Sequence, residues 1–324
     1  MLIDTHPDRD DLLVMHCGYS EKWRAESIPS KIWNKQIALW ELPILPNVRH
    51  LRENFTTSDF TKEAITHIKS ILVEQESTPY DGKFPGIPMA HQKQALDLAH
   101  SQPNFFFAHA MGAGKTYTIL TLAAHLYNTQ GLQGLLVVCP ATIREDVWLP
   151  QIKEWLAPLV TNVTAHVVLA GKYRTTERWL RNNEIGQMQV MIVSVQAMSD
   201  AKGRTYQLAQ KFLQSRKCAM AVDESSRIKN PKAKRTQNVI ELGNDAAWRW
   251  CATGTKITQG IHDLYSQFRF LDWRIIGHKS FYSFRNRYCK MGGFEGRKII
   301  GYNNTAELMD LIQPFIHVIR KEDA

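Results

Sequence analysis

Six short apolar segments, rich in β-branched and aromatic residues, alternate with amphipathic segments of helical periodicity over the middle of the chain. They are residues 104–110, 134–140, 165–171, 189–196, 218–224 and 248–254. Strands that are apolar along nearly their whole length are typical of a parallel sheet, because helices cover both of its faces. The pattern predicts an α/β fold with a mainly parallel sheet, in which ligands bind beyond the carboxyl ends of the strands.

The segment EQESTPYDGKFPGIP, residues 74–88, holds three prolines, two glycines and few apolar residues. Such a composition is typical of a boundary, since proline and glycine interrupt helices and strands. Before it, strand-like segments lie at residues 12–19 and 30–43, and helical patterns follow at residues 47–54 and 61–75. We therefore expect a small α+β module at residues 1–78 and an α/β lobe at residues 79–324.

Three tryptophans, Trp23, Trp33 and Trp40, stand out in the expected N-terminal module. Core packing is the interpretation that we favour, because an indole ring buries a large apolar area. Base stacking is the alternative, because exposed aromatic rings bind nucleobases in many proteins.

The formal net charge of +9 is concentrated in one part of the chain. Residues 1–80 hold 9 basic and 12 acidic side chains, a balance of −3, whereas residues 201–300 hold 20 basic and 7 acidic side chains, a balance of +13. A localised basic surface is typical of a protein that binds a polyanion, nucleic acid first. A solvated face that keeps the protein soluble is the alternative.

Other global features predict a soluble, intracellular (cytoplasmic) protein without a membrane partner. No stretch approaches the ~18 apolar residues of a membrane span, and the N-terminal sequence MLIDTHPDRDDLL is acidic, unlike a signal peptide. The five cysteines include no C-x-x-C pair, so neither a disulfide framework nor a structural zinc is expected. Cys139, Cys218 and Cys251 lie in apolar runs and are expected in the core.

The first chemical motif, AHAMGAGKT at residues 108–116, lies between an expected strand and an expected helix. Its backbone N–H groups can wrap a phosphate, because glycine permits the turn and the helix N-terminus favours an anion. Lys115 is expected to reach the β- and γ-phosphates, and the Thr116 hydroxyl to bind Mg²⁺. His109 stands where the pattern G-x-x-x-x-G-K-[ST] has its first glycine. The candidate nucleotide-binding residues here are Met111, Gly112, Ala113, Gly114, Lys115 and Thr116.

The second motif, VDESS at residues 222–226, closes another expected strand. Two adjacent carboxylates after an apolar strand are costly to bury without a purpose. Asp223 is a candidate for holding Mg²⁺, and Glu224 for accepting the proton of the attacking water. The alternative is an acidic helix N-terminus, which the helix dipole favours.

Three weaker signals lie at the same predicted edge. Thr142 and Glu145 form a possible capping box, although the same helix N-terminus can hold a DNA phosphate. The segment CATGTK, residues 251–256, places hydroxyls where nucleotide and nucleic acid can be coupled. Gln92 can pair with adenine through its amide, although an exposed helix residue is the more common explanation.

The order and spacing of all these motifs resemble those of the Swi/Snf-type branch of the superfamily 2 helicases and translocases, especially of its phage and bacterial members. The matching segments are MGAGKT, VVCPATIREDVW, SVQAM, VDESSRIKN and ATGTKITQGIHDLYSQFRFLD. In that family the phosphate loop reads D-E-M-G-L-G-K-T, which accounts for the missing first glycine. The resemblance runs from about residue 88 to the end, roughly three quarters of the chain.

The resemblance implies a RecA-like P-loop lobe that binds ATP and Mg²⁺ in a DNA-stimulated translocase. It implies adenine recognition by Gln92, phosphate binding by the glycine loop with Lys115, and Mg²⁺ binding and catalysis by Asp223 and Glu224. Residues implied to contact the DNA backbone or to couple it to ATP are Pro140, Ala141, Thr142, Thr253, Gly254 and Thr255.

The chain departs from the family in several places. Ser225 and Ser226 stand where many relatives have Ala-His, and Lys256 replaces the usual proline. The second RecA-like lobe of the family is absent from this sequence, and that lobe supplies arginine fingers worth ~10³–10⁵ in the rate of related phosphoryl transfers. We therefore expect the chain alone to be incomplete and to need a second lobe or a partner protein. The N-terminal module resembles the accessory modules of annealing helicases only weakly.

The leading hypothesis is the ATP-binding lobe of a DNA-dependent ATPase that translocates on double-stranded DNA. The first rival is a module that binds ATP and DNA but turns over little by itself. The second is a nucleotide-dependent structural or regulatory subunit without DNA contact. Since phosphate contacts carry no sequence information and no helix suggests base reading, binding without sequence specificity is expected.

Overall fold

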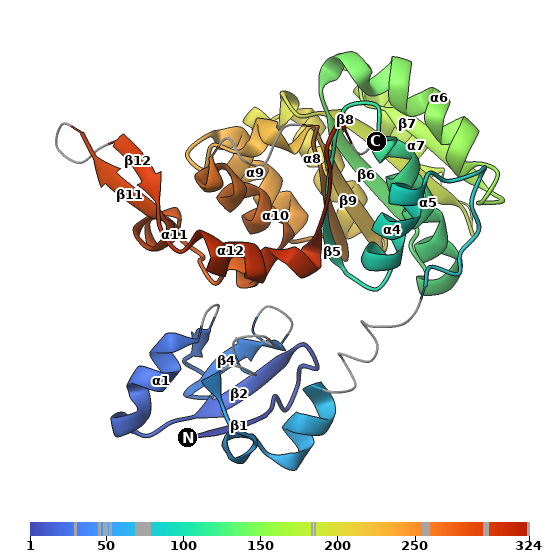
Figure 1. The fold of residues 1–324 in the computed structure, drawn as a ribbon. Helices are drawn as coiled ribbons and strands as arrows, with labels where there is room; N and C mark the ends of the chain where they lie inside the picture. The colour runs from blue at the N-terminus through green and yellow to red at the C-terminus, as the bar shows by residue number, and fades with distance from the viewer. Residues whose placement is uncertain are drawn as a thin grey trace. The chain divides into compact units, whose positions relative to one another are not determined.

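The computed structural model describes residues 1–28, 31–44, 47, 51, 54–68, 79–182, 184, 186–254, 260–293 and 298–322. Its internal contacts define two compact units (Figure 1). Unit 1 comprises Met1–Thr78 and Asp272–Pro314, and unit 2 comprises Pro79–Leu271 and Phe315–Ala324.

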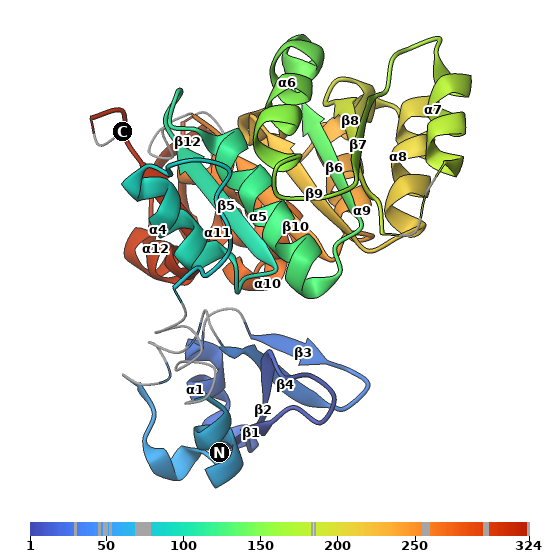
Figure 2. The same ribbon diagram turned by 90° about the vertical axis from the view of Figure 1, so that its right-hand side faces the viewer.

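Unit 2 is built on a seven-stranded sheet in the order β13-β5-β10-β9-β6-β8-β7, with every neighbouring pair parallel (Figure 2). The strands are β5 (Asn104–His109), β6 (Gly134–Cys139), β7 (Val163–Val167), β8 (Met188–Ser194), β9 (Cys218–Asp223), β10 (Trp248–Ala252) and β13 (Ile316–Ile319). Four of them, β5, β6, β8 and β9, are buried along their whole length, which explains their continuous apolar sequences.

Helices cover both faces of this sheet, as the α/β prediction requires (Figure 2). They are α4 (Ala90–Ala99), α5 (Lys115–Gln130), α6 (Leu149–Gln151), α7 (Tyr173–Arg181), α8 (Arg204–Gln214), α9 (Lys234–Gly243) and α10 (Leu264–Ile276). On one face, α4, α5 and the helical segment around α6 pack against Phe105 and Phe107. On the other, the ring of Phe106 contacts Phe268 of α10, with 5.8 Å between centroids.

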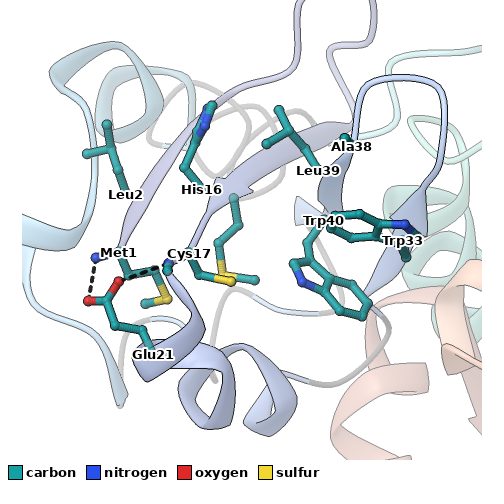
Figure 3. A pocket seen from close by; sticks show the side chains of 11 residues that line it. Met1, Leu2, His16, Cys17, Glu21, Trp33, Ala38, Leu39 and Trp40 are labelled. Atoms are coloured by element: carbon teal, nitrogen blue, oxygen red, sulfur yellow. Dashed lines mark hydrogen bonds and ion pairs between the residues drawn. The ribbon is translucent and has the colours of Figure 1, made fainter.

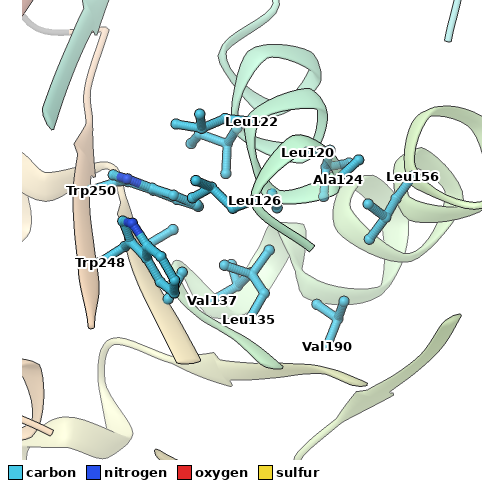
Figure 4. Close-up of a cluster of buried hydrophobic side chains, with 14 of the residues drawn as sticks. Leu120, Leu122, Ala124, Leu126, Leu135, Val137, Leu156, Val190, Trp248 and Trp250 are labelled. Atoms are coloured by element: carbon cyan, nitrogen blue, oxygen red, sulfur yellow. The ribbon is translucent and has the colours of Figure 1, made fainter. Parts of the chain in front are cut away.

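One large hydrophobic core lies between α5 and the sheet (Figure 4). Leu122 and Leu126 from α5 meet Trp248 and Trp250 from β10, and Trp250 has no exposed surface. The predicted core cysteines Cys139, Cys218 and Cys251 are all buried. Apolar burial of this extent is the main favourable term in folding.

The six predicted strands of this lobe are all present, and one of them is displaced. The strand predicted at 165–171 is β7, which covers Val163–Val167, because a turn follows in which Gly171 takes a φ of 80°. Strand β13 was not predicted. It lies at the edge of the sheet and is only partly buried, so its sequence lacks the apolar run of the inner strands.

The N-terminal part of unit 1 is a four-stranded antiparallel sheet in the order β1-β2-β4-β3, accompanied by helical segments and 3-10 turns. Its elements are β1 (Leu2–Thr5), β2 (Leu12–His16), α1 (Lys22–Ser27), β3 (Ile32–Asn34) and β4 (Leu39–Pro43). Helical patterns were predicted at residues 47–54 and 61–75. Residues 62–68 are helical, and parts of both ranges lie outside the described residues. The predicted α+β character is therefore present.

Core packing was the wrong prediction for two of the three tryptophans in this part. Trp23 is 69% exposed, and Trp33, on the edge strand β3, is 47% exposed. Trp40 is half-buried and meets the Trp33 ring edge to face at 5.2 Å. Both rings line a hollow of about 420 Å³, whose far side holds Glu21 bonded to the Met1 amino group (Figure 3). Base stacking by these rings stays a prediction.

The second part of unit 1 follows a break in α10, where Asp272 leaves the helical conformation. It contains α11 (Phe281–Tyr288), a hairpin of β11 (Cys289–Gly292) and β12 (Lys298–Tyr302), and α12 (Thr305–Ile312). Arg274 pairs with Asp272 and with Asp11, which ties the two parts of the unit together. The predicted division into 1–78 and 79–324 stays a prediction, and the contact-defined units differ from it in grouping Asp272–Pro314 with the N-terminal residues.

Candidate nucleotide-binding site

The loop between β5 and α5 is shaped by two glycines in the left-handed region. Gly112 has a φ of 86° and Gly114 a φ of 71°, conformations that are strained for residues with a Cβ. A Cβ on Gly114 would also lie 2.1 Å from Nε2 of Gln92. The loop therefore leads directly into the N-terminus of a 16-residue helix, where backbone N–H groups and the helix dipole favour an anion.

Lys115 is folded back onto the loop that precedes it. Its Nζ donates to the carbonyl oxygens of His109, at 3.1 Å, and Ala110, at 3.2 Å. These neutral acceptors hold the ammonium group beside the loop, where a phosphate would offer a stronger, charge-assisted partner. Thr116 follows in the first turn of α5 and is half-buried, while Met111 and Gly112 are exposed.

Asp223 ends β9 and is buried, as the burial of this strand requires. Its Oδ2 accepts a hydrogen bond from Nε1 of Trp148 at 3.1 Å, and its Oδ1 accepts one from the Glu224 backbone N–H at 2.9 Å. Burial raises the pKa of Asp223, and the bond from Trp148 and the charge of Lys115 oppose this effect. The carboxylate is thus short of compensating positive charge, which a bound cation would supply.

Glu224 has a left-handed backbone, with φ 50° and ψ 53°. This conformation is uncommon for a residue other than glycine, and such strain is concentrated at functional sites. Glu224 precedes the 3-10 turn Ser225–Ile228 and makes no capping hydrogen bond with its side chain, so helix capping does not explain it. Its half-buried carboxylate follows Asp223 directly at the carboxyl end of the sheet.

The segment after β10 lies against the phosphate loop. A Cβ on Gly254 would lie 3.0 Å from Cγ of Met111 and 3.5 Å from Nζ of Lys115. Thr253 is buried, and its backbone N–H donates to the Phe107 carbonyl. The structure therefore brings two predicted coupling residues to the nucleotide loop, and Thr255, the third, lies outside the described residues.

Gln92 is also next to the loop, and its expected exposure as an ordinary helix residue is wrong. Only 4% of its surface is accessible. Its Oε1 accepts from the Met89 backbone N–H at 2.9 Å, and its Nε2 lies 3.5 Å from the Ala113 carbonyl oxygen. The amide therefore joins the start of α4 to the phosphate loop.

The predicted capping box of Thr142 and Glu145 is absent. Pro140 occupies the N-cap position of the 3-10 turn Ala141–Ile143, and a π-helical turn, Arg144–Trp148, follows without a side-chain cap. Thr142 lies inside the turn because Pro140 already starts it, so its hydroxyl is not positioned as a cap. Ala141 and Thr142 are exposed after the carboxyl end of β6.

Sequence reasoning missed Trp148 and a cluster of three histidines. Nε2 of His109 lies 3.0 Å from Nδ1 of His317 on β13, and Nε2 of His91 lies 2.9 Å from the Ala113 carbonyl oxygen. His109 is fully buried, and burial, followed by the charges of His317, His91 and Lys115, lowers its pKa to about 3. The His109 ring, held neutral by burial, therefore lies between the rings of His91 and His317 behind the loop. The only signal for them was His109 in place of the usual glycine.

Ser225, one of the departures from the family pattern, has a clear structural role. It is buried, and its Oγ donates to Oε1 of Gln267 on α10 at 2.6 Å. Nε2 of Gln267 in turn donates to the Asp263 carbonyl at 3.1 Å. The segment after the acidic pair is thus linked to α10 through a hydroxyl.

The parallel sheet, with a glycine loop after β5 and an acidic pair after β9, defines a RecA-like lobe. The SNF2-related domain family matches residues 34–323, and the chain belongs to this family. The match starts within the N-terminal part of the chain, well before residue 88, where the sequence resemblance began.

Known relatives agree with this assignment. Helicase ssl-1 of Caenorhabditis elegans is 25% identical over 244 residues, 70% of this chain and 10% of that protein. The SWI/SNF-related matrix-associated actin-dependent regulator of chromatin subfamily A-like protein 1 of Drosophila melanogaster is 28% identical over 202 residues, 61% of this chain and 23% of that protein. The chain thus spans less than a quarter of either relative.

Solved structures show the same fold. The Sulfolobus solfataricus SWI2/SNF2 ATPase core in complex with dsDNA superposes with a TM-score of 0.57 at 20% identity, covering 76% of this chain and 47% of that chain. The core domain from the same organism gives a TM-score of 0.53 at 22% identity. Within the described residues, no helix is long and apolar enough to cross a membrane.

Proposed function

We propose that this chain is the ATP-binding lobe of a DNA-dependent ATPase that translocates on double-stranded DNA. The observation that carries the proposal is the convergence of Lys115, Gly254 and the phosphate loop at the sheet edge where Asp223 and Glu224 also lie. Membership of the SNF2-related domain family supports the same function.

The proposed chemistry assigns one task to each group. Gly112, Gly114 and Lys115 hold the phosphates, and Gln92, beside the loop, is assigned to adenine. The carboxylate of Asp223 and the hydroxyl of Thr116 are hard oxygen donors of the kind Mg²⁺ prefers, and the raised pKa of Asp223 marks a carboxylate that gains from a cation. Bound Mg²⁺ would neutralise charge on the phosphates. Glu224 orients the attacking water and accepts its proton.

DNA is the proposed partner, bound through its backbone and without sequence specificity. Support comes from the +13 balance over residues 201–300 and from the exposed turn that contains Ala141 and Thr142. Pro140, Thr253, Gly254 and Thr255 complete the proposed contact and coupling residues. The Sulfolobus solfataricus ATPase core, which has a similar fold, was solved in complex with dsDNA, and this agrees with the proposed partner.

The alternative is a module that binds ATP and DNA but turns over little until a second RecA-like lobe or a partner protein joins it. The observation that favours it is coverage, since the chain spans 47% of the solved ATPase core. We further propose an intracellular location, where ATP and DNA are found. Closeness to phage or bacterial members also stays a proposal, and the two named relatives are animal proteins.

A DNA-stimulated ATPase assay on the chain, alone and joined to a second lobe, tests the proposal. Glu224→Gln is expected to lower turnover about 10²–10⁴-fold while leaving ATP binding intact, because it removes only the proton acceptor. Lys115→Ala is expected to abolish binding itself. Unchanged turnover in Glu224→Gln would refute the assigned role, and DNA-stimulated hydrolysis by the chain alone would refute the module alternative.

A further inference from the structure

The β11–β12 hairpin pairs with no other strand among the described residues. An isolated two-stranded hairpin is only marginally stable in water, so it needs support from its surroundings. Phe284 and Tyr288 of α11 and Cys289 at the start of β11 are buried and anchor its base. The strands beyond this anchor are displayed to solvent, as the exposure of Lys290, Lys298 and Ile300 shows (Figure 1).

Each of the three large exposed side chains on the hairpin lies beside a glycine. A Cβ on Gly301 would lie 3.6 Å from Cδ of Lys290, and one on Gly292 would lie 2.5 Å from Cδ1 of Ile300. Lys298 likewise has its Cβ 3.3 Å from the Cβ position of Gly293. Ile300 lies next to a bulge in the strand pairing. Its side chain therefore occupies the space that a side chain at Gly292 would fill, and it is nevertheless 65% exposed.

This segment is strongly basic. Residues 281–302 hold one acidic side chain, Glu295, and five basic ones, which are Arg285, Arg287, Lys290, Arg297 and Lys298. Arg287 is paired with Glu307 of α12, and Arg285 lies over the Tyr282 ring. Lys290 and Lys298 have no ion-pair partner among the described residues. In the described part of the chain, two ammonium groups without an ion pair thus flank one apolar side chain.

We infer that the β11–β12 hairpin is a second DNA-binding surface, in which Lys290 and Lys298 bind phosphates of a duplex and Ile300 contacts deoxyribose. The inference rests on the proposed function, that the protein binds DNA. The complementarity is specific to a backbone, because paired cations suit phosphates and an aliphatic side chain suits the sugar. Contacts to phosphate and sugar need no unpaired base, so Lys290, Lys298 and Ile300 suit duplex DNA.

The test is fluorescence anisotropy of a short labelled duplex with the full chain at several salt concentrations. Each lost phosphate contact lowers the slope of log Kd against log salt by about 0.9, so K290S/K298S is expected to lower the slope by about 1.8. Over one decade of salt this corresponds to a loss of affinity of about 60-fold at 0.1 M relative to 1 M. I300S is expected to weaken binding about two- to fivefold without changing the slope, because it removes no charge. G292V is expected to act like I300S, since the new side chain would displace Ile300.

The matched control is K35S/K62S, which removes two exposed lysines from the same unit. An equal loss in this control would overturn the inference, because net charge alone would then explain the result. If K290S/K298S has the same slope of log Kd against log salt as the parent protein, the inference about the hairpin is overturned, while the proposed function stands. If the parent protein shows no salt-dependent DNA binding, the proposed function itself fails. Circular dichroism spectra and urea unfolding curves like those of the parent protein are expected for all hairpin variants and show that they fold.

Discussion

The nucleotide edge of unit 2 and the hairpin of unit 1 place charged groups in opposite ways. At the edge, Asp223 is buried and hydrogen-bonded through both oxygens, and Lys115 is bonded to its own loop. On the hairpin, Lys290 and Lys298 extend into solvent. Buried, positioned charges suit chemistry on a small ligand, because a low-dielectric site strengthens each interaction. Exposed charges suit a large polyanion, because the gain comes from counterion release.

The largest effect that sharpens this contrast concerns the core beneath the nucleotide edge. Trp250 is completely buried in β10, next to the strand that carries Asp223. Trp250→Ala is expected to lower the free energy of unfolding by about 3–5 kcal/mol, because it leaves a cavity in a packed core. Urea unfolding measures this change. A loss below about 1 kcal/mol would show that unit 2 tolerates cavities and is not rigidly packed.

The second effect tests whether His109, behind the loop, is neutral in the folded protein. The pKa of His109 falls from 6.5 to about 3 on folding. Between these values the unfolded chain binds a proton that the folded chain does not, so stability decreases as pH falls from 6.5. His109→Gln can keep the bond to His317 but carries no proton-binding group. The difference in unfolding free energy between parent and variant is therefore expected to change by about 1.4 kcal/mol per pH unit in this window.

Urea titrations of both proteins at pH 7, 6, 5 and 4.5 give this comparison, and other titrating groups cancel to a first approximation. The matched control is His16→Gln, which removes a histidine from the exposed end of β2. Parallel curves for parent and His109→Gln would mean that His109 is charged or hydrated in the folded protein.

The third effect concerns Trp148, which supports the site without belonging to a motif. Trp148→Phe keeps a buried aromatic ring and removes the donor to Asp223 Oδ2. Loss of one hydrogen bond to a charged group costs about 1.5–3 kcal/mol, so turnover is expected to fall about 10- to 100-fold. Initial ATPase rates at a range of Mg²⁺ concentrations measure it. Full recovery of the rate at high Mg²⁺ would place the defect in metal binding, and an unchanged rate at low Mg²⁺ would remove Trp148 from the site.

These contrasts also explain how far sequence reasoning could go. The inner strands of unit 2 were predictable because both faces are buried, and a continuous apolar run is the direct result. The loop after β5 and the pair Asp223 and Glu224 were predictable because local chemistry requires those residues in that order. Their partners were not, since Trp148 and Asp223 are 75 residues apart and only the fold brings them together.

Unit 1 was less predictable because its elements are short and half-exposed. Strand β3 has three residues, and none of them is fully buried, so its pattern does not say which face is inside. The hairpin β11–β12 was missed for the same reason, since Lys290, Gly292 and Lys298 occupy strand positions that usually hold β-branched residues. In such segments only tertiary support decides the structure.

The smallest effect concerns the exposed tryptophans of unit 1 and compares Trp23 with Trp33, which lies beside Trp40. Trp23 of α1 is 69% exposed, so Trp23→Ser is expected to change the free energy of unfolding by no more than about 0.5 kcal/mol, as surface substitutions generally do. Trp33→Ser, at 47% exposure and beside Trp40, is the matched comparison and is expected to cost somewhat more. Both are measured by urea unfolding, with DNA affinity measured on the same samples. Unchanged stability together with weakened DNA binding would indicate that the exposed rings form a base-stacking surface. A loss of stability above about 2 kcal/mol for Trp23→Ser would instead indicate that Trp23 packs in the core.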